Sequence, residues 1–456
     1  MTRLDQLLLR ELGPDVVSLD QDLLRDCSHD ESEQEAVMPD VVVTPADPLQ
    51  VEILLRLAAE HRFFVTPRGA GTGKSGGSVP MRGGVSLSFH RMDAILEVDP
   101  ENLLAVVEPG ATCERLQQAA WDAGLFYPPD PASLATCSLG GNVAENAGGP
   151  RAFRYGVTRE YVLGLEAVRI GGQRFDVGHR PVKGVSGYDL TALLTGSEGT
   201  LAVFSKLIFK LIPQPKAPGL LILYFPSVHE AVRAVTVLVQ NQLFPMALEL
   251  LDRRSLDAAR TETFSPSSIA GGALFCELEG LADAPHLAQG VLDALARAGA
   301  APSDHVLAAD PVTAGAAWNA RRDVSSRLKA LHARKISEDV AVPRALLPEL
   351  VLGIREIAGE LGLESACYGH AGDGNLHVNF LTDGDGAAFA TAVERLFRLT
   401  LLLGGTLSGE HGIGTLKRRF LPAEHAPAVL DMFMAVKRAW DPDGLLNPGK
   451  VLDSVP

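Results

Sequence analysis

The sequence predicts an α+β protein with two large domains, and three observations support this prediction. From Val41 onward, strand and helix patterns alternate and are interrupted by glycine-rich loops. The segment IPQPKAPG (212–219) carries three prolines and marks a domain boundary. After it the pattern restarts as strand, helix, strand and then strand, helix, which indicates an α+β sandwich with helices on one face.

The net charge and the cysteine content argue against several classes of protein. The 456 residues include 56 acidic side chains against 41 Lys and Arg, a net charge of -15, so a basic footprint for nucleic acid is absent. The five cysteines are far apart and form no C-x-x-C pair, which argues against a disulfide framework, a thiolate zinc site or an iron-sulfur cluster. No apolar stretch reaches about 18 residues and the N-terminus has no apolar signal core, so we expect a cytoplasmic protein that is not integral to a membrane. Peripheral attachment to the inner membrane is the alternative.

The elements of the first domain follow a helical, acidic lead-in over residues 1–36. We expect the domain itself over 37–215, with strands at 41–44, 63–66, 85–89, 94–99 and 103–109, and helices at 48–61 and 113–123. The glycine-rich loops lie at 67–77, 128–150 and 195–203. The strand KLIFKLIP closes the domain before the prolines.

The second domain is expected over 216–420, followed by a C-terminal segment over 421–456. Its predicted elements are the strand LLILYF (220–225), a helix over 228–240, an apolar stretch around MALELLD (246–252), the strand ALFCELEG (273–280) and a helix over 285–298. The end of the chain, DPDGLLNPGKVL (441–452), is rich in turn residues.

The first glycine-rich loop, PRGAGTGKSGG (67–77), resembles the tail of an ATP-binding P-loop but fails the pattern. The first glycine of that motif would have to stand at Arg68, and the glycines after Ser75 exclude the helix that must follow. What is left is a run of backbone N–H groups suited to an anion or a cofactor pyrophosphate, with a plain surface turn as the alternative. Three such loops in one domain indicate a ligand as long as a dinucleotide.

These loops also carry a family resemblance that extends from about Val41 to Leu452. PRGAGTGKSGG, PPDPAS with GGNVAENAGG, and GSEGT, in this order, resemble the FAD domain of the vanillyl-alcohol-oxidase (PCMH) type. Within it the chain is similar to the FAD-linked D-2-hydroxy-acid dehydrogenases, which include the glycolate oxidase flavin subunit, D-lactate dehydrogenase and D-2-hydroxyglutarate dehydrogenase. The resemblance implies a PCMH-type FAD-binding domain, an α+β cap domain for the substrate, and a C-terminal segment that returns to the FAD domain.

The resemblance assigns the cofactor residues by position. The expected FAD contacts are Pro67, Arg68, Gly69, Ala70, Gly71, Thr72, Gly73, Ser75, Gly76, Gly77, Pro129, Asp130, Pro131, Ser138, Gly140, Gly141, Asn142, Asn146, Gly148, Glu198, Gly199, Val203 and Asn447. Covalent members carry a histidine close to the position of Thr72, so noncovalent FAD is expected. Lys74 departs from the apolar residue that is common in relatives and is interpreted as a solvent-facing substitution.

A histidine hairpin, YGHAGDGNLHVNF (368–380), is the main signal outside the flavin loops. With Asp373-Gly374 as a two-residue turn, His370 would pair with His377 across the ladder. Their Cβ atoms would then be about 5 Å apart, close enough for the two imidazoles to share one ion. SGEHGIG (408–414) offers Glu410 and His411; two histidines and a carboxylate suit Zn or Mn. Hydrogen-bonded structural histidines and a polar turn are the alternatives. The resemblance implies His370, His377 and Glu410 as metal ligands. His411, beside them, would then be free to act as the catalytic base.

The segment WNARRDVSSRLKALHARKISEDVAVP (318–343) holds the expected substrate clamp. The resemblance places Arg321 on the substrate carboxylate, and Ser325, Lys335 and Asn379 are further substrate-binding candidates. Without the resemblance, this segment would be interpreted as the solvated face of a charged helix.

The implied function is FAD-dependent oxidation of a D-2-hydroxy acid, with D-lactate or glycolate favoured, to the 2-oxo acid. The metal would polarise the hydroxyl, His411 would take its proton and hydride would pass to flavin N5. Electrons would go to a separate acceptor: a quinone, a cytochrome, an electron-transfer flavoprotein or an iron-sulfur subunit. The alternatives are a D-2-hydroxyglutarate dehydrogenase and a non-catalytic flavin-binding subunit, and a homodimer stays an option.

Overall fold

The chain divides into two compact units in the computed structural model, which describes residues 4–280 and 282–452. Unit 1 comprises Met1–Gly148, Val157–Gln214 and Glu410–Pro456, and unit 2 comprises Gly149–Gly156 and Pro215–Gly409. The chain therefore enters unit 2 at the prolines and leaves it at Gly409, earlier than the residue 420 expected from the sequence. The excursion 149–156 was not expected either; Arg151 holds it on unit 2 through a 3.0 Å ion pair with Glu277.

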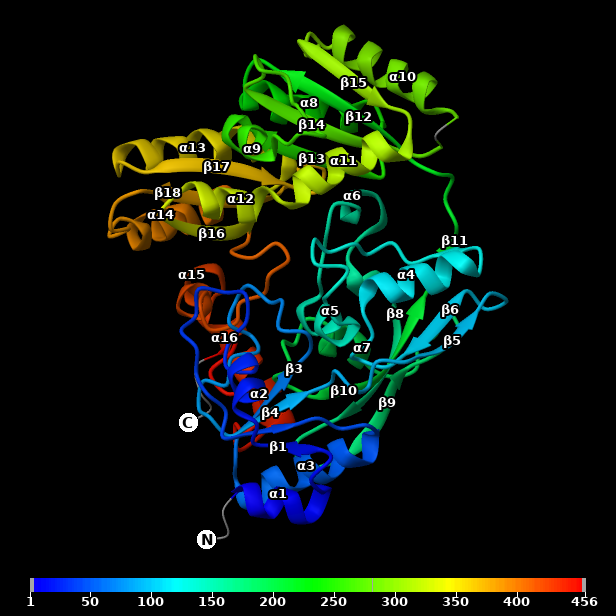
Figure 1. The fold of residues 1–456 in the computed structure, drawn as a ribbon, viewed down its shortest axis with the longest axis vertical. Helices are drawn as coiled ribbons and strands as arrows, with labels where there is room; N and C mark the ends of the chain where they lie inside the picture. The colour runs from blue at the N-terminus through cyan, green and yellow to red at the C-terminus, as the bar shows by residue number, and fades with distance from the viewer. Residues whose placement is uncertain (1–3, 281, 453–456) are drawn as a thin grey trace. The chain divides into compact units, whose positions relative to one another are not determined.

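Unit 1 is built on two main sheets (Figure 1). A mixed sheet has the order β1-β2-β4-β3, formed by β1 (Val17–Ser18), β2 (Val41–Val43), β4 (Val85–Ser88) and β3 (Val65–Arg68). An antiparallel sheet has the order β5-β6-β10-β8-β9, formed by β5 (Ile95–Asp99), β6 (Leu104–Val107), β10 (Val203–Lys210), β8 (Val162–Val168) and β9 (Arg174–Gly178). β7 (Leu125–Phe126) pairs with β11 (Ile212–Pro213).

Capping residues set the ends of the helices of unit 1. In α3 (Pro48–His61), Asp47 accepts from the N–H of Gln50 at 3.0 Å and Arg62 ends the helix in the left-handed conformation. Leu54 and Leu55 of α3 are fully buried in a core that also takes residues of α1 and the mixed sheet. The helices and 3-10 turns of unit 1 are α1 (Leu4–Leu12), α2 (Gln21–Asp26), α3, α4 (Cys113–Asp122), α5 (Leu139–Glu145), η1 (Thr158–Tyr161), α7 (Leu190–Leu194), η3 (Arg418–Phe420), α15 (Leu421–Glu424) and α16 (Pro427–Trp440).

Unit 2 contains one antiparallel sheet of seven strands. Its order is β15-β12-β14-β13-β17-β18-β16, formed by β15 (Asp304–Ala308), β12 (Gly219–Phe225), β14 (Gly272–Leu278), β13 (Ala247–Asp252), β17 (Glu364–Gly369), β18 (Asn375–Thr382) and β16 (Arg334–Ala341).

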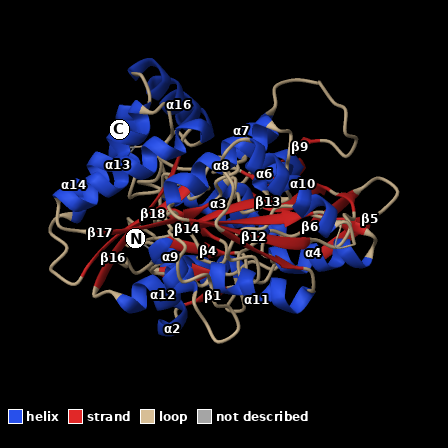
Figure 2. Cartoon of the chain, turned by 90° about the horizontal axis from the view of Figure 1, so that it is seen from above, coloured by secondary structure: helices blue, strands red, loops and turns tan. Residues whose placement is uncertain are grey.

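Helices cover both faces of this sheet, whereas the sequence led us to expect them on one face. Figure 2 shows α13 and α14 on one side of β16, β17 and β18, and α12 on the other. On the α12 side, α9 and α11 complete an apolar core with residues such as Leu251 and Phe275. The helices and 3-10 turn of unit 2 are α6 (Ala152–Tyr155), α8 (Val228–Gln240), α9 (Arg253–Ala259), α10 (Ala284–Arg297), α11 (Pro311–Arg322), α12 (Val324–Leu331), η2 (Arg344–Leu346), α13 (Leu347–Glu360) and α14 (Phe389–Leu402).

The register of the sheet differs from the predicted histidine hairpin. Tyr368, and not His370, stands opposite His377, because β17 ends at Gly369 and a longer turn precedes β18. Gly374 has φ +88°, and a Cβ there would lie 2.1 Å from the carbonyl oxygen of Val342, so packing against that neighbouring strand end shapes the turn. His370 is thereby moved out of the β17–β18 ladder.

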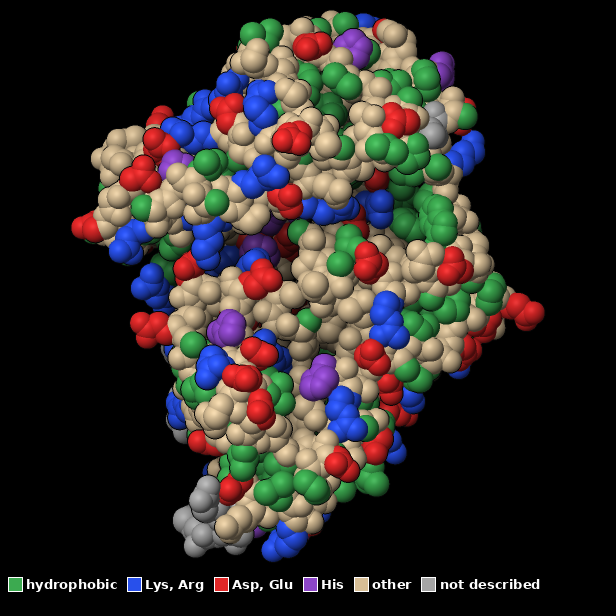
Figure 3. Space-filling view, in the orientation of Figure 1, with side chains coloured by type: hydrophobic (Ala, Val, Ile, Leu, Met, Phe, Trp, Pro, Cys, Tyr) green, Lys and Arg blue, Asp and Glu red, His purple; other side chains and the backbone are tan. Residues whose placement is uncertain are grey.

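The surface mixes charges of both signs. Acidic and basic side chains are interspersed over the face shown in Figure 3. Among the described residues, no helix has the length and apolar composition needed to cross a bilayer.

Candidate active site

The predicted cofactor loops converge within unit 1. A Cβ at Gly69 would lie 2.1 Å from the hydroxyl of Ser138, so the first loop passes directly against the second, where only glycine fits. Asn447, in the left-handed conformation at φ +44°, donates from its side-chain amide to the carbonyls of Gly77 at 3.1 Å and Glu198 at 2.7 Å. The C-terminal segment thus joins the first and third loops into one cradle.

Two buried carboxylates lie at the centre of this cradle. Glu198 accepts from the backbone N–H groups of Ile413 and Gly414, both at 2.7 Å. Burial raises the pKa of Glu198, although those hydrogen bonds oppose the rise. Burial raises the pKa of Glu145 well above its ordinary value, and the negative charges of Glu198 and Asp30 add to the effect.

The cradle also presents buried polar atoms that no described residue satisfies. They are Ser75 Oγ, Asn142 Nδ2, Glu145 Oε2, Ser197 Oγ and Asn447 Oδ1. Because buried polar groups in proteins nearly always have partners, these atoms indicate a polar ligand that extends over all the loops. An elongated dinucleotide such as FAD fits this set, which adds Glu145 and Ser197 to the residues expected from the sequence.

Other residues at the cofactor loops have structural contacts. Lys74 forms an ion pair with Glu31 at the surface, which agrees with its interpretation as a solvent-facing substitution. The carbonyl of Pro129 accepts from Gln117 at 2.8 Å, and the side chain of Val203 is buried in the apolar core of the unit. Asn146 ends α5 in the left-handed conformation and accepts from the N–H of Arg159.

In unit 2, a second group of buried polar side chains comprises Glu249, His370 and Arg321, and Glu249 contacts both of the others. Its carboxylate is fully buried, with Oε1 2.6 Å from Nδ1 of His370 and Oε2 2.5 Å from Nη2 of Arg321. Burial raises the pKa of Glu249, but the interactions with its donors His370 and Arg321 outweigh burial and lower it to about 2. Glu249 is therefore an ionised carboxylate that accepts from both neighbours.

Arg321 is held in a geometry suited to an anion. Its side chain is 7% exposed, its guanidinium carbon lies 4.8 Å from the ring centroid of Tyr368, and Nη2 is bound to Glu249. The buried Nε has no hydrogen-bond partner among the described residues. A planar guanidinium with one donor engaged and another unsatisfied is ready to grip a small carboxylate.

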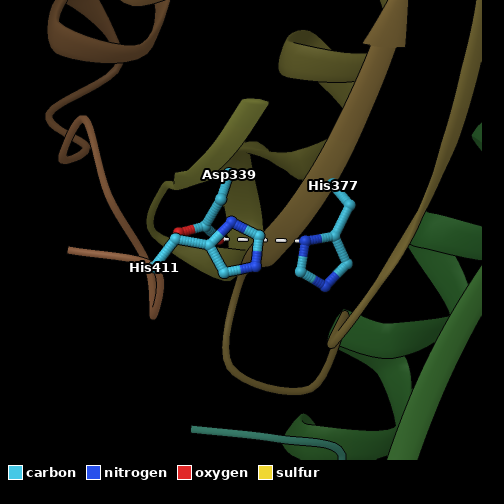
Figure 4. A group of neighbouring side chains, drawn as sticks. All are labelled: Asp339, His377 and His411. Atoms are coloured by element: carbon cyan, nitrogen blue, oxygen red, sulfur yellow. Dashed lines mark ion pairs between the residues drawn. The ribbon is translucent and has the colours of Figure 1, made fainter. Parts of the chain in front are cut away.

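The two histidines come together although they do not pair in the ladder. Their ring centroids are 5.2 Å apart. Each ring has a carboxylate nearby. Nδ1 of His370 lies 2.6 Å from Oε1 of Glu249. Nδ1 of His377 lies 4.0 Å from Oδ1 of Asp339 (Figure 4). Two histidines with carboxylate partners form a donor set that fits a divalent metal such as Zn or Mn.

The remaining substrate candidates adjoin this cluster. Lys335 Nζ donates to the hydroxyl of Ser325 at 2.8 Å and to its carbonyl at 3.0 Å. Ser325 does not continue the helix of Arg321, because α11 ends at Arg322 and α12 begins at Val324. Asn379 is fully buried and its Oδ1 has no partner among the described residues.

Glu410 and His411 are the first residues of the C-terminal segment of unit 1. A Cβ at Gly148 would lie 2.8 Å from Oε2 of Glu410, so this carboxylate packs against the second cofactor loop. Just before them, Gly409 and Ser408 are anchored in unit 2: Asp339 Oδ2 accepts from the N–H of Gly409 at 2.8 Å and from the hydroxyl of Ser408 at 3.1 Å.

The sequence reasoning missed Glu249, Asp339 and Tyr368. A signal was present for Glu249, which interrupts the apolar run MALELLD, whereas Asp339 lies in the mostly polar strand RKISEDVA and gave no such signal. A charged residue inside a strand that is otherwise apolar indicates a buried partner of opposite charge or a donor cluster.

Comparison with known proteins gives two matching families. Residues 214–451 match the C-terminal domain of FAD linked oxidases and residues 39–178 match an FAD binding domain. The glycolate oxidase subunit GlcD of Bacillus subtilis is 37% identical over 432 residues, covering 93% of this chain and 91% of the relative. D-lactate dehydrogenase of Archaeoglobus fulgidus is 37% identical over 420 residues, covering 90% and 91%. Among solved structures, p-cresol methylhydroxylase with substrate bound has the same fold, with a TM-score of 0.78 at 18% identity over 99% of this chain and 96% of that one.

Proposed function

Because the chain belongs to the FAD-linked oxidases, we propose that it oxidises a small D-2-hydroxy acid, D-lactate or glycolate, to the 2-oxo acid. The names of its relatives support this substrate class, since one is a glycolate oxidase subunit and another a D-lactate dehydrogenase.

The observation that carries the proposal is the state of Arg321. Its guanidinium is buried, fixed at Nη2 by Glu249 and against the ring of Tyr368, and its Nε has no partner among the described residues. Leaving a buried guanidinium donor unsatisfied is costly unless a ligand completes it. A substrate carboxylate supplies the missing acceptor, and the rigid fork fixes the orientation of the acid.

Beside Arg321, His370 and His377 would hold a divalent metal. Glu410 follows Gly409 directly in the chain, and we assign it as the third protein ligand. When bound, the metal supplies a Lewis acid that lowers the pKa of the substrate hydroxyl. His370, His377 and Glu410 would offer the metal two imidazole nitrogens and one carboxylate, the ligand set typical of a catalytic site with an open position.

His411 would remove the hydroxyl proton. It is adjacent to Glu410 in sequence, with its Nε2 3.9 Å from Glu410 Oε1. The loops of unit 1 would hold FAD, which would supply a two-electron acceptor for the hydride of C2, so that the two electrons and both hydrogens of the CH–OH group are accounted for. A separate acceptor would then reoxidise the flavin.

Charge placement favours a monocarboxylate. Arg322, one of two candidate cations for a second carboxylate, is exposed and its Nη1 lies 3.3 Å from the side-chain oxygen of Asn319. Lys335 is the other candidate and is bound to Ser325. D-2-hydroxyglutarate would therefore have to recruit Lys335 away from Ser325.

An anaerobic bleaching screen tests the proposal. The FAD-loaded protein is mixed with glycolate, D- and L-lactate, and D- and L-2-hydroxyglutarate, and flavin absorbance is followed. We expect rapid bleaching with D-lactate or glycolate and little with the L-acids. Faster bleaching by D-2-hydroxyglutarate would change the substrate, and no bleaching by any 2-hydroxy acid would refute the proposed reaction.

A further inference from the structure

We infer that Glu249 is a positioning residue that couples the metal site to the substrate clamp, an inference that rests on the proposed function. One buried carboxylate contacts the proposed metal ligand His370 through Oε1 and the proposed substrate clamp Arg321 through Oε2. The role of Glu249 would be to fix the orientation of both side chains at once.

The sheet register explains why these residues meet. On β13 and β17, Leu250 stands opposite Gly369. Continued by one residue, this register sets Glu249 opposite His370, just past the end of β17. Arg321 reaches the same carboxylate from the last turn of α11, the helix that covers this face of the sheet. The contact is therefore determined by elements far apart in the sequence.

The hydrogen bond to Glu249 selects the tautomer of His370. Because Glu249 also forms a buried ion pair with the guanidinium of Arg321, its carboxylate is the acceptor, and the Nδ1 atom of His370 that lies 2.6 Å from Oε1 carries the hydrogen. The ring lone pair is then on Nε2, which leaves this nitrogen available to a metal. Carboxylate partners of this kind orient metal-binding histidines in general.

The second oxygen of Glu249 fixes the arginine. With Nη2 held at 2.5 Å and the guanidinium plane against Tyr368, the fork cannot rotate without breaking a buried ion pair. The donor left unsatisfied, Nε, then has a fixed direction. Removing the negative charge of Glu249 should loosen the metal ligand and the substrate clamp together.

Substitution by an amide tests this role sharply. Both partners of Glu249 are donors, and Glu249→Gln offers one acceptor oxygen and one NH₂ group, so it can satisfy only one of them. Glu249→Asp keeps two acceptors on a shorter side chain and should restore part of the function. Glu249 is completely buried, so Glu249→Gln can fold poorly. In that case Glu249→Asp is the variant that tests the role of Glu249.

Glu277 provides the matched control. It lies on the adjacent strand β14, its side chain is 6% exposed, and it forms a 3.0 Å ion pair with Arg151. Glu277→Gln therefore removes a buried charge from a Glu–Arg pair in the same sheet without touching the histidines or Arg321. Any general effect of such a loss on stability appears in both variants.

The experiment measures Zn²⁺ affinity by competition with a chelator, FAD content, thermal unfolding, and kcat and KM for the best acid. In Glu249→Gln we expect Zn²⁺ affinity to fall about 10- to 100-fold and KM to rise, with FAD content unchanged. Glu249→Asp should lie between the wild type and Glu249→Gln, and Glu277→Gln should keep wild-type Zn²⁺ affinity and KM.

Two results would overturn the inference in distinguishable ways. Wild-type Zn²⁺ affinity and KM in Glu249→Gln would show that Glu249 is only structural, while the proposed function stands. Absence of saturable Zn²⁺ or Mn²⁺ binding in the wild type would remove the metal from the proposed function and this inference with it.

Discussion

The backbone N–H of Gly409 donates a 2.8 Å hydrogen bond to the buried carboxylate of Asp339. The same Oδ2 accepts from Ser408, and Oδ1 accepts from the side-chain amide of Asn375 at 2.6 Å. Asp339 thus fixes the two residues that come directly before the proposed metal ligand and the proposed base. It does so from the strand next to His377.

Asp339→Asn should therefore reduce both stability and turnover. The amide replaces an acceptor by a donor that faces other donors, at a cost of about 1–3 kcal/mol in the free energy of unfolding. If anchoring of residues 408–409 matters for catalysis, kcat should fall at temperatures well below unfolding. Ser408→Ala, which removes only one of the three donors, should have a smaller effect on both quantities; an equal kcat in Asp339→Asn and the wild type would exclude a role for the anchor.

Arg321→Lys should raise KM by about 10- to 100-fold, because an ammonium keeps the charge but loses the planar fork that grips a carboxylate. FAD content should not change, since the cofactor loops belong to unit 1. The neighbour Arg322 is exposed, so Arg322→Lys is the control and should behave as the wild type. Steady-state kinetics with the best acid decide the matter, and an unchanged KM in Arg321→Lys would remove this residue from substrate binding.

Local chemistry accounts for the parts of the fold that the sequence predicts well. The helix expected over 228–240 has those bounds in the structure, because Ser227 caps it and an apolar stripe with helical spacing packs it on the sheet. The chain enters unit 2 within the proline-rich segment, and the glycine loops meet where close backbone approach demands glycine.

Contacts between distant segments explain what the sequence did not predict. His370 and Glu249 are 121 residues apart, and no local pattern reports that pairing. The hairpin was misjudged because Asp373-Gly374 is a strong local turn signal, while a Cβ at Gly372 would lie 2.4 Å from the ring of Phe153, far away in sequence. Packing of residues 149–156 against this turn therefore competes with the preference of Asp373-Gly374 for a two-residue hairpin turn.

Stability of the flavin-free protein should depend on pH through Glu145. The folded-state pKa of this carboxyl is raised by burial and by Glu198 and Asp30, so folding favours its protonated form. The resulting stability is fully present below the unfolded-state pKa, about 4.3, and is lost as pH rises through the folded-state value. Glu145→Gln removes the contribution of this carboxyl.

The melting temperature of Glu145→Gln minus that of the wild type should therefore grow between pH 5 and pH 8. Thermal unfolding of flavin-free samples measures it. Glu101→Gln, a substitution at an exposed site, should show a difference that is flat with pH. A flat difference for Glu145→Gln as well would mean that its carboxyl titrates normally in the fold.

Denaturation should release FAD from the protein in its free, unmodified form. The first cofactor loop carries a threonine at position 72 and offers no imidazole for a flavin bond there. Acid precipitation should put the yellow colour in the supernatant, with an absorbance spectrum of free FAD. Colour kept in the washed pellet would instead indicate a covalent bond.

Glu410 and His411 are neighbours in sequence but have different proposed roles, so their alanine variants should fail differently. His411→Ala should keep metal and FAD and slow flavin reduction by about 10² to 10⁴, the usual contribution of a general base. Glu410→Ala should first lower metal occupancy, and added Zn²⁺ or Mn²⁺ should then restore part of its activity because His370 and His377 are still present. Metal analysis and anaerobic stopped-flow reduction with the best acid separate the two variants. If His411→Ala loses the metal while Glu410→Ala keeps it, the roles are exchanged; if His411→Ala reduces its flavin at the wild-type rate, another group takes the proton.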